Sequence, residues 1–288
     1  FGADHPYGNP LSGTGTEAAI TALTRDDLVG FHQRMLQPKG ATLVVVGDTT
    51  LPEIVPVLER NFGDWKVNAA AAAPAIPAVA NIKQPRVFLI DQPGAVQANL
   101  FAAELVPSSK DAGAIAFDMA NQVFGGDFTA RLNMNLREDK HWSYGARSGA
   151  GNSVGPRMWT ASAPVQIDKT AESVAEMKRE IADFASGKQG ATAEEVSGMQ
   201  KILTLSLPGA YETAASVMGT IGSNLLYGRP DDYVFKRKAE IEAMTPAQVD
   251  VAAKALDPNA LTWVVVGDLS KTEQVVRALN LGEVTILD

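Results

Sequence analysis

The segment from residue 124 to residue 148 contains the side chains of this chain that are best suited to chemistry. It reads FGGDFTARLNMNLREDKHWSYGARS and brings four cations close in sequence to two aromatic residues, namely Arg131, Arg137, Lys140, Arg147, Trp142 and Tyr144. Arginine presents a rigid set of N–H donors and tyrosine a phenolic hydroxyl, and both suit a peptide carbonyl or a developing oxyanion. The segment therefore predicts a substrate clamp. The alternative is a helix with a solvated basic face and an aromatic cap.

Cysteine and histidine do not form a recognisable metal-binding motif in this sequence. The chain contains no cysteine, which excludes disulfides and thiolate metal ligands. Its three histidines are His5, His32 and His141, and none has a second histidine or a carboxylate at metal-ligand spacing. Because both H-E-x-x-H and H-x-x-E-H are absent, we expect each histidine to be a surface or core residue.

The elements expected around the clamp are strands followed by grouped helices. A helix over 128–139 would place Phe128, Leu132 and Leu136 on one face, after a break at Gly125-Gly126. Strands are predicted at 86–91, at 96–105 and on both sides of a glycine-rich turn at 149–156, and helices at 111–123, 170–186, 192–207 and 212–226. This order predicts an α+β fold with a mainly antiparallel sheet and helices on one face.

One pattern occurs twice, about 220 residues apart. The first copy reads HPYGNP, LTRDDL and ATLVVVGD, and the second reads LLYGRP, MTPAQV and LTWVVVGD, so that Tyr7 corresponds to Tyr227. A period of this length indicates a duplicated domain. The second copy is preceded by many residues of its own and the first by only six, so we expect the first copy to be truncated.

Each copy predicts a capped helix, a buried strand and a second helix. In the first copy, residues 16–36 form the helical region, 43–46 the strand and 51–62 the second helix, with a capping box from Thr24 to Asp27. In the second copy, Thr245 and Gln248 form the box, 263–266 the strand and 271–280 the closing helix. We therefore expect residues 1–66 to be the C-terminal part of a first domain, 67–85 a proline-bearing linker and 86–288 a second domain.

Composition restricts the classes of partner. The chain has 288 residues, is 45% hydrophobic and has a net charge of −8 with a pI near 5.0. This acidity argues against a nucleic-acid partner, because neutralising phosphates requires a basic face. No run of 18 apolar residues occurs, so we expect no membrane span. The compartment of this expected bacterial protein stays open between periplasm and cytoplasm, with the periplasm favoured.

The motifs and their order resemble the pitrilysin/insulinase family of zinc metallopeptidases, the inverzincins, of which mitochondrial processing peptidase is a member. The run HPYG, LT..DL and LVVVGD carries the resemblance, and so does the later GG…RLN..LREDK..SYG. It extends from about residue 5 to residue 288. In this family a first domain that carries H-x-x-E-H is followed by a sister α+β domain without that motif.

The resemblance implies where the zinc belongs. In the family two histidines and a downstream glutamate hold zinc, and the glutamate of the motif activates a water molecule. These residues precede HPYG in the family and are not in this chain. The resemblance therefore implies zinc in the full-length protein or a partner subunit, none bound by this fragment, and no peptidase activity of the fragment alone.

The resemblance also assigns roles to two residues. The family's sister domain supplies an arginine and a tyrosine that reach the substrate, and Arg137 and Tyr144 occupy these places with the family's spacing. Arg137 would hold a substrate carbonyl and Tyr144 would hydrogen-bond the tetrahedral oxyanion. His141 and Trp142 stand where the family has a glycine and an aliphatic residue, and Trp142 could reshape the pocket beside Tyr144.

Two functions of different classes follow. The first is the sister-domain part of a zinc endopeptidase, which contributes substrate binding and a chamber wall, and the second is a non-catalytic peptide-binding or scaffolding subunit of such a peptidase. A weaker third reading is a purely structural subunit. In the first two cases the expected partner is a peptide or an unfolded polypeptide, and we expect the chain to work in a homo- or hetero-oligomer.

Overall fold

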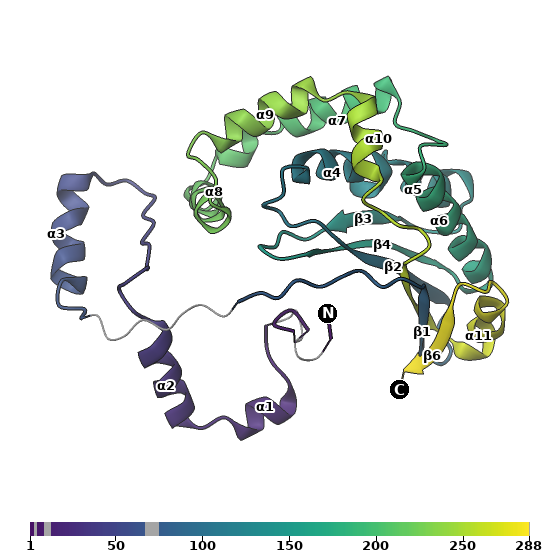
Figure 1. Cartoon of the computed structure of the whole chain (residues 1–288), viewed down its shortest axis with the longest axis horizontal. Helices are drawn as coiled ribbons and strands as arrows, with labels where there is room; N and C mark the ends of the chain where they lie inside the picture. Colours follow the sequence, from purple (N-terminus) through teal and green to yellow (C-terminus); the bar gives the residue numbers. More distant parts are fainter. Residues whose placement is uncertain (3–4, 9–12, 67–74, 288) are drawn as a thin grey trace. The chain divides into compact units, whose positions relative to one another are not determined.

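The computed structural model describes residues 1–2, 5–8, 13–66 and 75–287 and divides into two compact units (Figure 1). Unit 1 comprises Phe1–Val79 and Gly209–Leu225, and unit 2 comprises Ala80–Pro208 and Leu226–Asp288. Residues 67–74 of the expected linker lie outside the described residues. The domain limits drawn from the sequence stay a prediction.

A six-stranded sheet forms the centre of unit 2 (Figure 1). Its spatial order is β3-β4-β2-β5-β1-β6; the first three pairings are antiparallel, whereas β5–β1 and β1–β6 are parallel. The strands are β1 (Arg86–Asp91), β2 (Gln97–Val106), β3 (Arg147–Ala150), β4 (Arg157–Gln166), β5 (Thr262–Gly267) and β6 (Glu283–Leu287). The expected mainly antiparallel sheet is confirmed.

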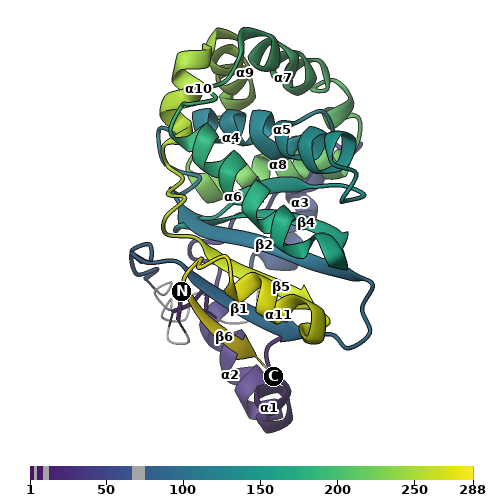
Figure 2. The same cartoon turned by 90° about the vertical axis from the view of Figure 1, so that its right-hand side faces the viewer.

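Helices of unit 2 cover one face of this sheet. Along β2, buried residues alternate with more exposed ones, as the two-residue period of a strand requires. Helices α4 (Ala114–Asn121), α6 (Thr170–Ala185) and α11 (Leu269–Arg277) lie on the buried face (Figure 2). The core between the layers includes Trp159 and Trp263, which are at most 1% exposed. Burying one large apolar side chain contributes roughly 1.5–3 kcal/mol, so this layer supplies most of the stability of the unit. The expected α+β fold is confirmed.

The helices after α4 depart from the expected regular pattern. The expected break at Gly125-Gly126 is instead the end of a π-helix, η1 (Gln122–Gly126), which continues α4 directly. The expected helix over 128–139 begins later, as the short α5 (Arg131–Asn133), and continues as the π-helix η2 (Met134–Asp139). Phe128 precedes this helix and is 58% exposed, so its expected inward position is wrong.

The remaining helices complete both units. In the second half of the chain they are α7 (Ala193–Leu205), α8 (Ala214–Tyr227), α9 (Tyr233–Ala243), α10 (Pro246–Ala253) and the short 3₁₀ turns η3 (Ile167–Lys169) and η4 (Gly209–Tyr211). The expected capping box of the second copy forms at the start of α10, where Thr245 and Gln248 satisfy each other's backbone N–H groups. Helix α9 and strand β6 were not expected from the sequence.

Unit 1 contains three helices from the first part of the chain. They are α1 (Glu17–Ala22), α2 (Arg25–Met35) and α3 (Leu51–Phe62). The expected box from Thr24 to Asp27 forms at the start of α2, and the same residue Thr24 separates α2 from α1. The expected single helical region over 16–36 is therefore two helices.

The strand expected at 43–46 does not form. These residues carry no strand hydrogen bonds, and Leu43 and Val45 are 59% and 45% exposed, whereas the equivalent strand β5 of the second copy is buried between β1 and β2. A strand is stabilised by hydrogen bonds to neighbours, and in the described residues this run has none. Helices α1, α2 and α3 bury no residue.

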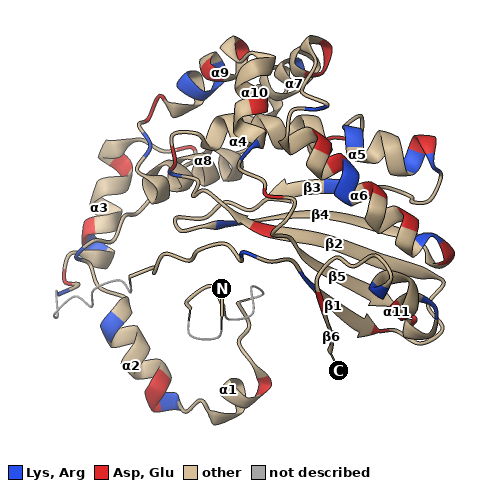
Figure 3. Ribbon diagram, turned by 45° about the vertical axis from the view of Figure 1, so that its right-hand side comes forward, with Lys and Arg blue, Asp and Glu red and all other residues tan. Residues whose placement is uncertain are grey.

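Charged residues lie mainly on the helices, and the strands of the sheet carry few (Figure 3). On α6, Arg179 pairs with Glu176 at 2.7 Å and with Asp183 at 3.0 Å, at helical spacings of three and four residues. None of the helices among the described residues has the length and apolar character that a bilayer crossing needs.

Glu104 is a buried carboxyl group on the helix-covered face of β2. Its side chain is 6% exposed and both oxygens accept the backbone N–H of Asp257, at 3.0 and 3.1 Å. Burial raises the pKa of Glu104 to about 7; the hydrogen bond from Asp257 opposes this increase, and the negative charge of the Asp257 carboxylate adds to it. Folding therefore favours the protonated form of this group.

The free energy of unfolding of unit 2 should fall as the pH rises. Because the folded pKa of Glu104 lies above its unfolded value of 4.5, its contribution is fully present below that value and is lost as the pH rises through about 7. The loss should be roughly 2–3 kcal/mol for a shift of this size. Urea unfolding followed by the fluorescence of Trp159 and Trp263 measures it at pH 5 and pH 8.

The variant Glu104→Gln separates this group from the others that titrate. The amide keeps an acceptor for the Asp257 N–H and has no charge to desolvate. The free energy of unfolding of the variant, relative to that of the natural chain, should therefore rise between pH 5 and pH 8. If the two proteins differed in free energy of unfolding by the same amount at both pH values, Glu104 would not be the group that makes stability depend on pH.

Candidate substrate-binding site

Arg137 and Tyr144 line one open pocket of unit 2, with a volume of about 560 Å³. Arg137 comes from η2, and Tyr144 from the loop between η2 and β3. The other residues of the lining come from η1 and its following loop, from α5, from β3 and from β4, and are Gly125, Gly126, Asp127, Phe128, Asn133, Gly145, Ala146, Arg147, Ser162 and Pro164. The two residues expected to form a clamp therefore share one cavity.

The guanidinium group of Arg137 lies against an aromatic ring. Its Cζ is 4.6 Å from the ring centre of Phe128, and its Nε is 3.3 Å from a carboxylate oxygen of Glu138. A cation over an exposed ring contributes about 0.5–1 kcal/mol, which restricts the side chain. Within the described residues the Nη groups of Arg137 make no hydrogen bond, so they are available to a ligand.

Tyr144 projects from a well-anchored backbone. Its side chain is 85% exposed. The preceding residue, Ser143, donates its hydroxyl to the carbonyl oxygen of Pro164 at 2.6 Å and accepts the backbone N–H of Gly145 at 3.1 Å. Ser143 also forms a β-bridge to Val165 of β4. The phenolic hydroxyl therefore reaches solvent from a loop that the sheet holds in place.

The floor of the pocket depends on a close contact between η1 and β3. A Cβ atom at Gly125 would lie 2.5 Å from Oγ and 2.8 Å from the backbone nitrogen of Ser148, so only glycine fits. Beneath this contact Asn121 accepts hydrogen bonds from the Ser148 hydroxyl at 2.7 Å and from the Trp159 indole N–H at 2.8 Å. These bonds are buried and fix η1 against the sheet.

The other members of the basic segment have different positions. Arg131 is held by Glu195, with Nε and Nη2 at 2.5 and 2.6 Å from the two carboxylate oxygens, and serves the fold. Lys140 lies 6.0 Å from the ring centre of Trp142, which packs against the core and does not line the pocket. Arg147 does line it. The structure thus brings Arg137, Arg147 and Tyr144 together and leaves Arg131, Lys140 and Trp142 outside.

The histidines have no metal-binding arrangement. His5 is buried and its Nε2 lies 3.0 Å from the carbonyl oxygen of Pro77, whereas His32 and His141 are exposed. Over the ranges that the structure describes, no three histidine, cysteine, aspartate or glutamate side chains are placed to hold a metal ion.

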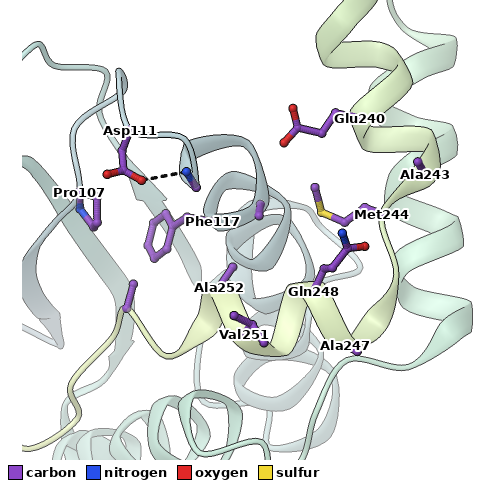
Figure 4. A pocket seen from close by; sticks show the side chains of 13 residues that line it. Pro107, Asp111, Phe117, Glu240, Ala243, Met244, Ala247, Gln248, Val251 and Ala252 are labelled. Carbon is purple, nitrogen blue, oxygen red and sulfur yellow. Dashed lines mark hydrogen bonds between the residues drawn. The ribbon is translucent and has the colours of Figure 1, made fainter.

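A second pocket of unit 2, of about 610 Å³, lies between α4, α9 and α10 (Figure 4). Phe117, Met244, Val251 and several alanines form its walls, and Glu240 and Asp111 are its charged residues. Its lining includes no arginine, tyrosine or histidine. It therefore offers no cationic or phenolic donor for a developing oxyanion, and the pocket of Arg137 and Tyr144 is the better candidate.

Sequence reasoning missed several residues of the site. Phe128 was expected in a helix core and instead supports Arg137, and Asn133 had no expected role although it lines the pocket. The Gly125-Gly126 pair was the available signal, because adjacent glycines in a helical pattern indicate a close backbone approach. The arrangement as a whole can bind a carbonyl oxygen or an oxyanion with cationic and phenolic donors.

Comparison with known proteins identifies a family and a fold. The sequence profile of the Peptidase M16 inactive domain matches residues 22–203. An uncharacterized zinc protease of Mycobacterium leprae is 22% identical over 282 residues, which cover 96% of this chain and 62% of that protein. The chain therefore spans less than two thirds of the length of this curated relative.

Solved structures share the fold. A peptidase M16 inactive domain from Pseudomonas fluorescens has a TM-score of 0.81 at 21% identity, over 92% of this chain and 62% of that one. A chain of complex III2 from Candida albicans has a TM-score of 0.74 at 13% identity, over 94% and 65%. At these identities the likeness concerns the fold alone.

Replacing Gly125 with alanine should destabilise unit 2 by about 2 kcal/mol, because the new methyl group forces η1 away from the backbone of β3. The matched control is Gly149→Ala in β3, where a methyl group would meet no atom within 4 Å. Urea unfolding followed by the fluorescence of the buried Trp159 compares the two variants. Equal midpoints for the two variants would show that the contact is not tight.

Proposed function

The chain belongs to the family of M16 peptidase inactive domains, and from this premise we propose that it is part of a zinc-dependent endopeptidase. In this proposal, unit 2 is the sister domain without zinc, which contributes substrate binding and part of the chamber wall. The observation that carries the proposal is the shared pocket of Arg137 and Tyr144.

The two residues would act on the scissile peptide bond. The Nη groups of Arg137 would donate to a substrate carbonyl, and the exposed hydroxyl of Tyr144 would donate to the oxyanion of the tetrahedral intermediate. Such donors accelerate a reaction only where they bind the transition state more strongly than the substrate. The loop anchored by Ser143 supports this role. Because the backbone of Tyr144 is already held in place, its hydroxyl needs little reorganisation when negative charge develops on the substrate.

Zinc does not fit the residues of this chain. The described residues contain no set of three metal ligands, and the pocket presents two arginines, whose charge repels a cation. We therefore place the zinc of the peptidase in another part of the full-length protein or in a partner subunit. When bound there, it would supply the activated water.

The substrate would be a peptide or an unfolded polypeptide. Strand β3 pairs with β4 on one side, and among the described strands it has no neighbour on the other. Arg147 lies on β3 and also lines the pocket. The Ser148 carbonyl oxygen on this edge already accepts a hydrogen bond from the Asn121 amide at 3.2 Å. A peptide could add through the remaining main-chain groups of β3 and present a carbonyl to Arg137.

A second candidate is a non-catalytic subunit that binds peptides or scaffolds an active partner. The matching family is described as an inactive domain, and one structural neighbour is a chain of complex III2, a multi-subunit assembly. In either case we propose that the chain works in a homo- or hetero-oligomer. The discriminating feature is an H-x-x-E-H motif with a later glutamate elsewhere in the same polypeptide.

Removing either donor should slow peptide turnover by the full-length assembly. Arg137→Ala and Tyr144→Phe should each lower kcat by about 100-fold or more, which is typical for the loss of one oxyanion donor. The measurement is cleavage of a fluorogenic peptide at saturating and limiting concentrations. The idea is wrong if both variants keep full turnover.

The matched controls for this experiment are Arg86→Ala and Tyr233→Phe. Arg86 lies 5.4 Å from the ring centre of Phe88, as Arg137 lies over Phe128, but neither Arg86 nor Tyr233 lines the pocket. These controls should keep turnover within about twofold, since most surface substitutions are nearly neutral.

The purified 288-residue chain should contain no stoichiometric zinc and should cleave no peptide, because no set of metal ligands occurs in the part of the chain that the structure describes. Elemental analysis after dialysis tests the first point. Tight zinc that disappears on mutation of His5, His32 or His141 would refute it.

A further inference from the structure

Asn133 is a buried amide at the rim of the pocket. It ends α5 and is only 3% exposed. Its Nδ2 donates to the carbonyl oxygen of Phe128 at 2.6 Å, and its Oδ1 accepts the backbone N–H of Ala146 at 3.0 Å. Because one partner can only accept and the other can only donate, both ends of the amide have a defined orientation.

These two bonds join the two segments that carry the clamp. Phe128 supports the guanidinium group of Arg137 at 4.6 Å, and Ala146 follows Tyr144 by two residues. Among the described residues no hydrogen bond links Phe128 directly to the stretch 143–147. The backbone of η2 itself meets the segment before Tyr144 through the Trp142 N–H, which donates to the Leu136 carbonyl oxygen at 3.0 Å, and through a 3.1 Å contact of the His141 Nδ1 with the Arg137 carbonyl oxygen. The amide of Asn133 adds the side-chain link between the ring that supports Arg137 and the backbone that follows Tyr144.

The surrounding backbone leaves this connection little freedom. A Cβ atom at Gly145 would stand 3.7 Å from Oδ1 of Asn133, which is ordinary contact distance, so the loop packs closely on the amide. The hydrogen bond to Ala146 is buried and the one to Phe128 is partly buried, so breaking either leaves a poorly solvated donor or acceptor without its partner. The geometry of the two segments should thus depend on the amide.

We propose that Asn133 is a positioning residue that sets the separation between the guanidinium group of Arg137 and the hydroxyl of Tyr144. This inference rests on the proposed function of that pair. Two donors that act on one tetrahedral centre must be held to a fraction of an ångström, and buried hydrogen bonds to their supporting backbone achieve this. Of the two side chains closest in shape to asparagine, aspartate lacks the donor and leucine lacks both the donor and the acceptor.

A purely structural role for Asn133 makes different predictions. If the amide only stabilised the fold, its loss would lower the fraction of folded protein and would leave kcat per folded molecule unchanged. Substitutions at Asn133 and at Arg137 would also act independently, so their effects on turnover would multiply in the double variant. A positioning role predicts a lower kcat in folded protein and effects that do not multiply.

The test uses the full-length protein in its assembly and a fluorogenic peptide substrate. Asn133→Asp keeps the acceptor for Ala146 and loses the donor to Phe128, and Asn133→Ala loses both. We expect each to lower kcat by about 10- to 100-fold with a smaller change in KM, because a displacement of about 1 Å has an effect of this size. In the background of Arg137→Ala, Asn133→Asp should reduce kcat by less than about threefold more.

The matched control is Asn81→Asp. Asn81 makes the same kind of bridge, since its Nδ2 donates to the carbonyl oxygen of Leu105 at 2.7 Å and its Oδ1 accepts the Leu105 N–H at 2.9 Å. It does not line the pocket. Its kcat should stay within about twofold of the natural protein.

Amide hydrogen exchange gives a readout that does not depend on activity. In Asn133→Ala, exchange at Ala146 should accelerate at least tenfold while the β2 and β4 amides stay protected. Unchanged exchange at Ala146, or a kcat of Asn133→Asp equal to that of the Asn81 control while Arg137→Ala is slow, would overturn the positioning role. If Arg137→Ala and Tyr144→Phe are fully active, the proposed function fails, and the exchange result still decides whether Asn133 connects the two segments.

Discussion

The candidate site depends on the close approach of η1 to β3. Gly125 leaves no space for a side chain at this contact, and the buried amide of Asn121 links Ser148 of β3 to Trp159 of β4 through hydrogen bonds. The π-helical turns η1 and η2 and the loops after them bring residues from η2 and from the loop before β3 to one pocket, where Arg147 of β3 and Ser162 of β4 also lie.

In the proposed function, the pocket separates substrate binding from metal chemistry. Arginine and tyrosine are suited to a carbonyl or an oxyanion, and the positive charge of the arginines is unsuited to a zinc ion. A peptidase that divides these tasks between domains can keep its donors rigid on one domain and its metal on another, and the reaction then requires both parts to meet around the substrate. The inactive-domain family and the longer relatives fit such a division.

The two copies of the internal repeat show which elements local sequence can determine without tertiary contacts. Both capping boxes form, at Thr24 and at Thr245, because each needs only residues three positions apart. The two apolar runs that follow differ in outcome. Residues 262–267 lie between β1 and β2 and form β5, whereas 43–46 have no neighbouring strand in the described residues and stay extended and solvent-accessible.

The sequence by itself determined the helix caps, most strand positions in unit 2, the α+β class and the family, and it predicted a role for Arg137 and Tyr144, which line one pocket. These depend on short-range chemistry or on the order of motifs. Only the tertiary structure decided that Phe128 lies under Arg137, that Asn133 joins the two halves of the clamp and that Arg131 belongs to Glu195. The physical reason is that each of these is a contact between a side chain and a distant partner. The distance between them depends on the π-helical turns and on packing against β3, and residue type and spacing alone do not reveal either feature.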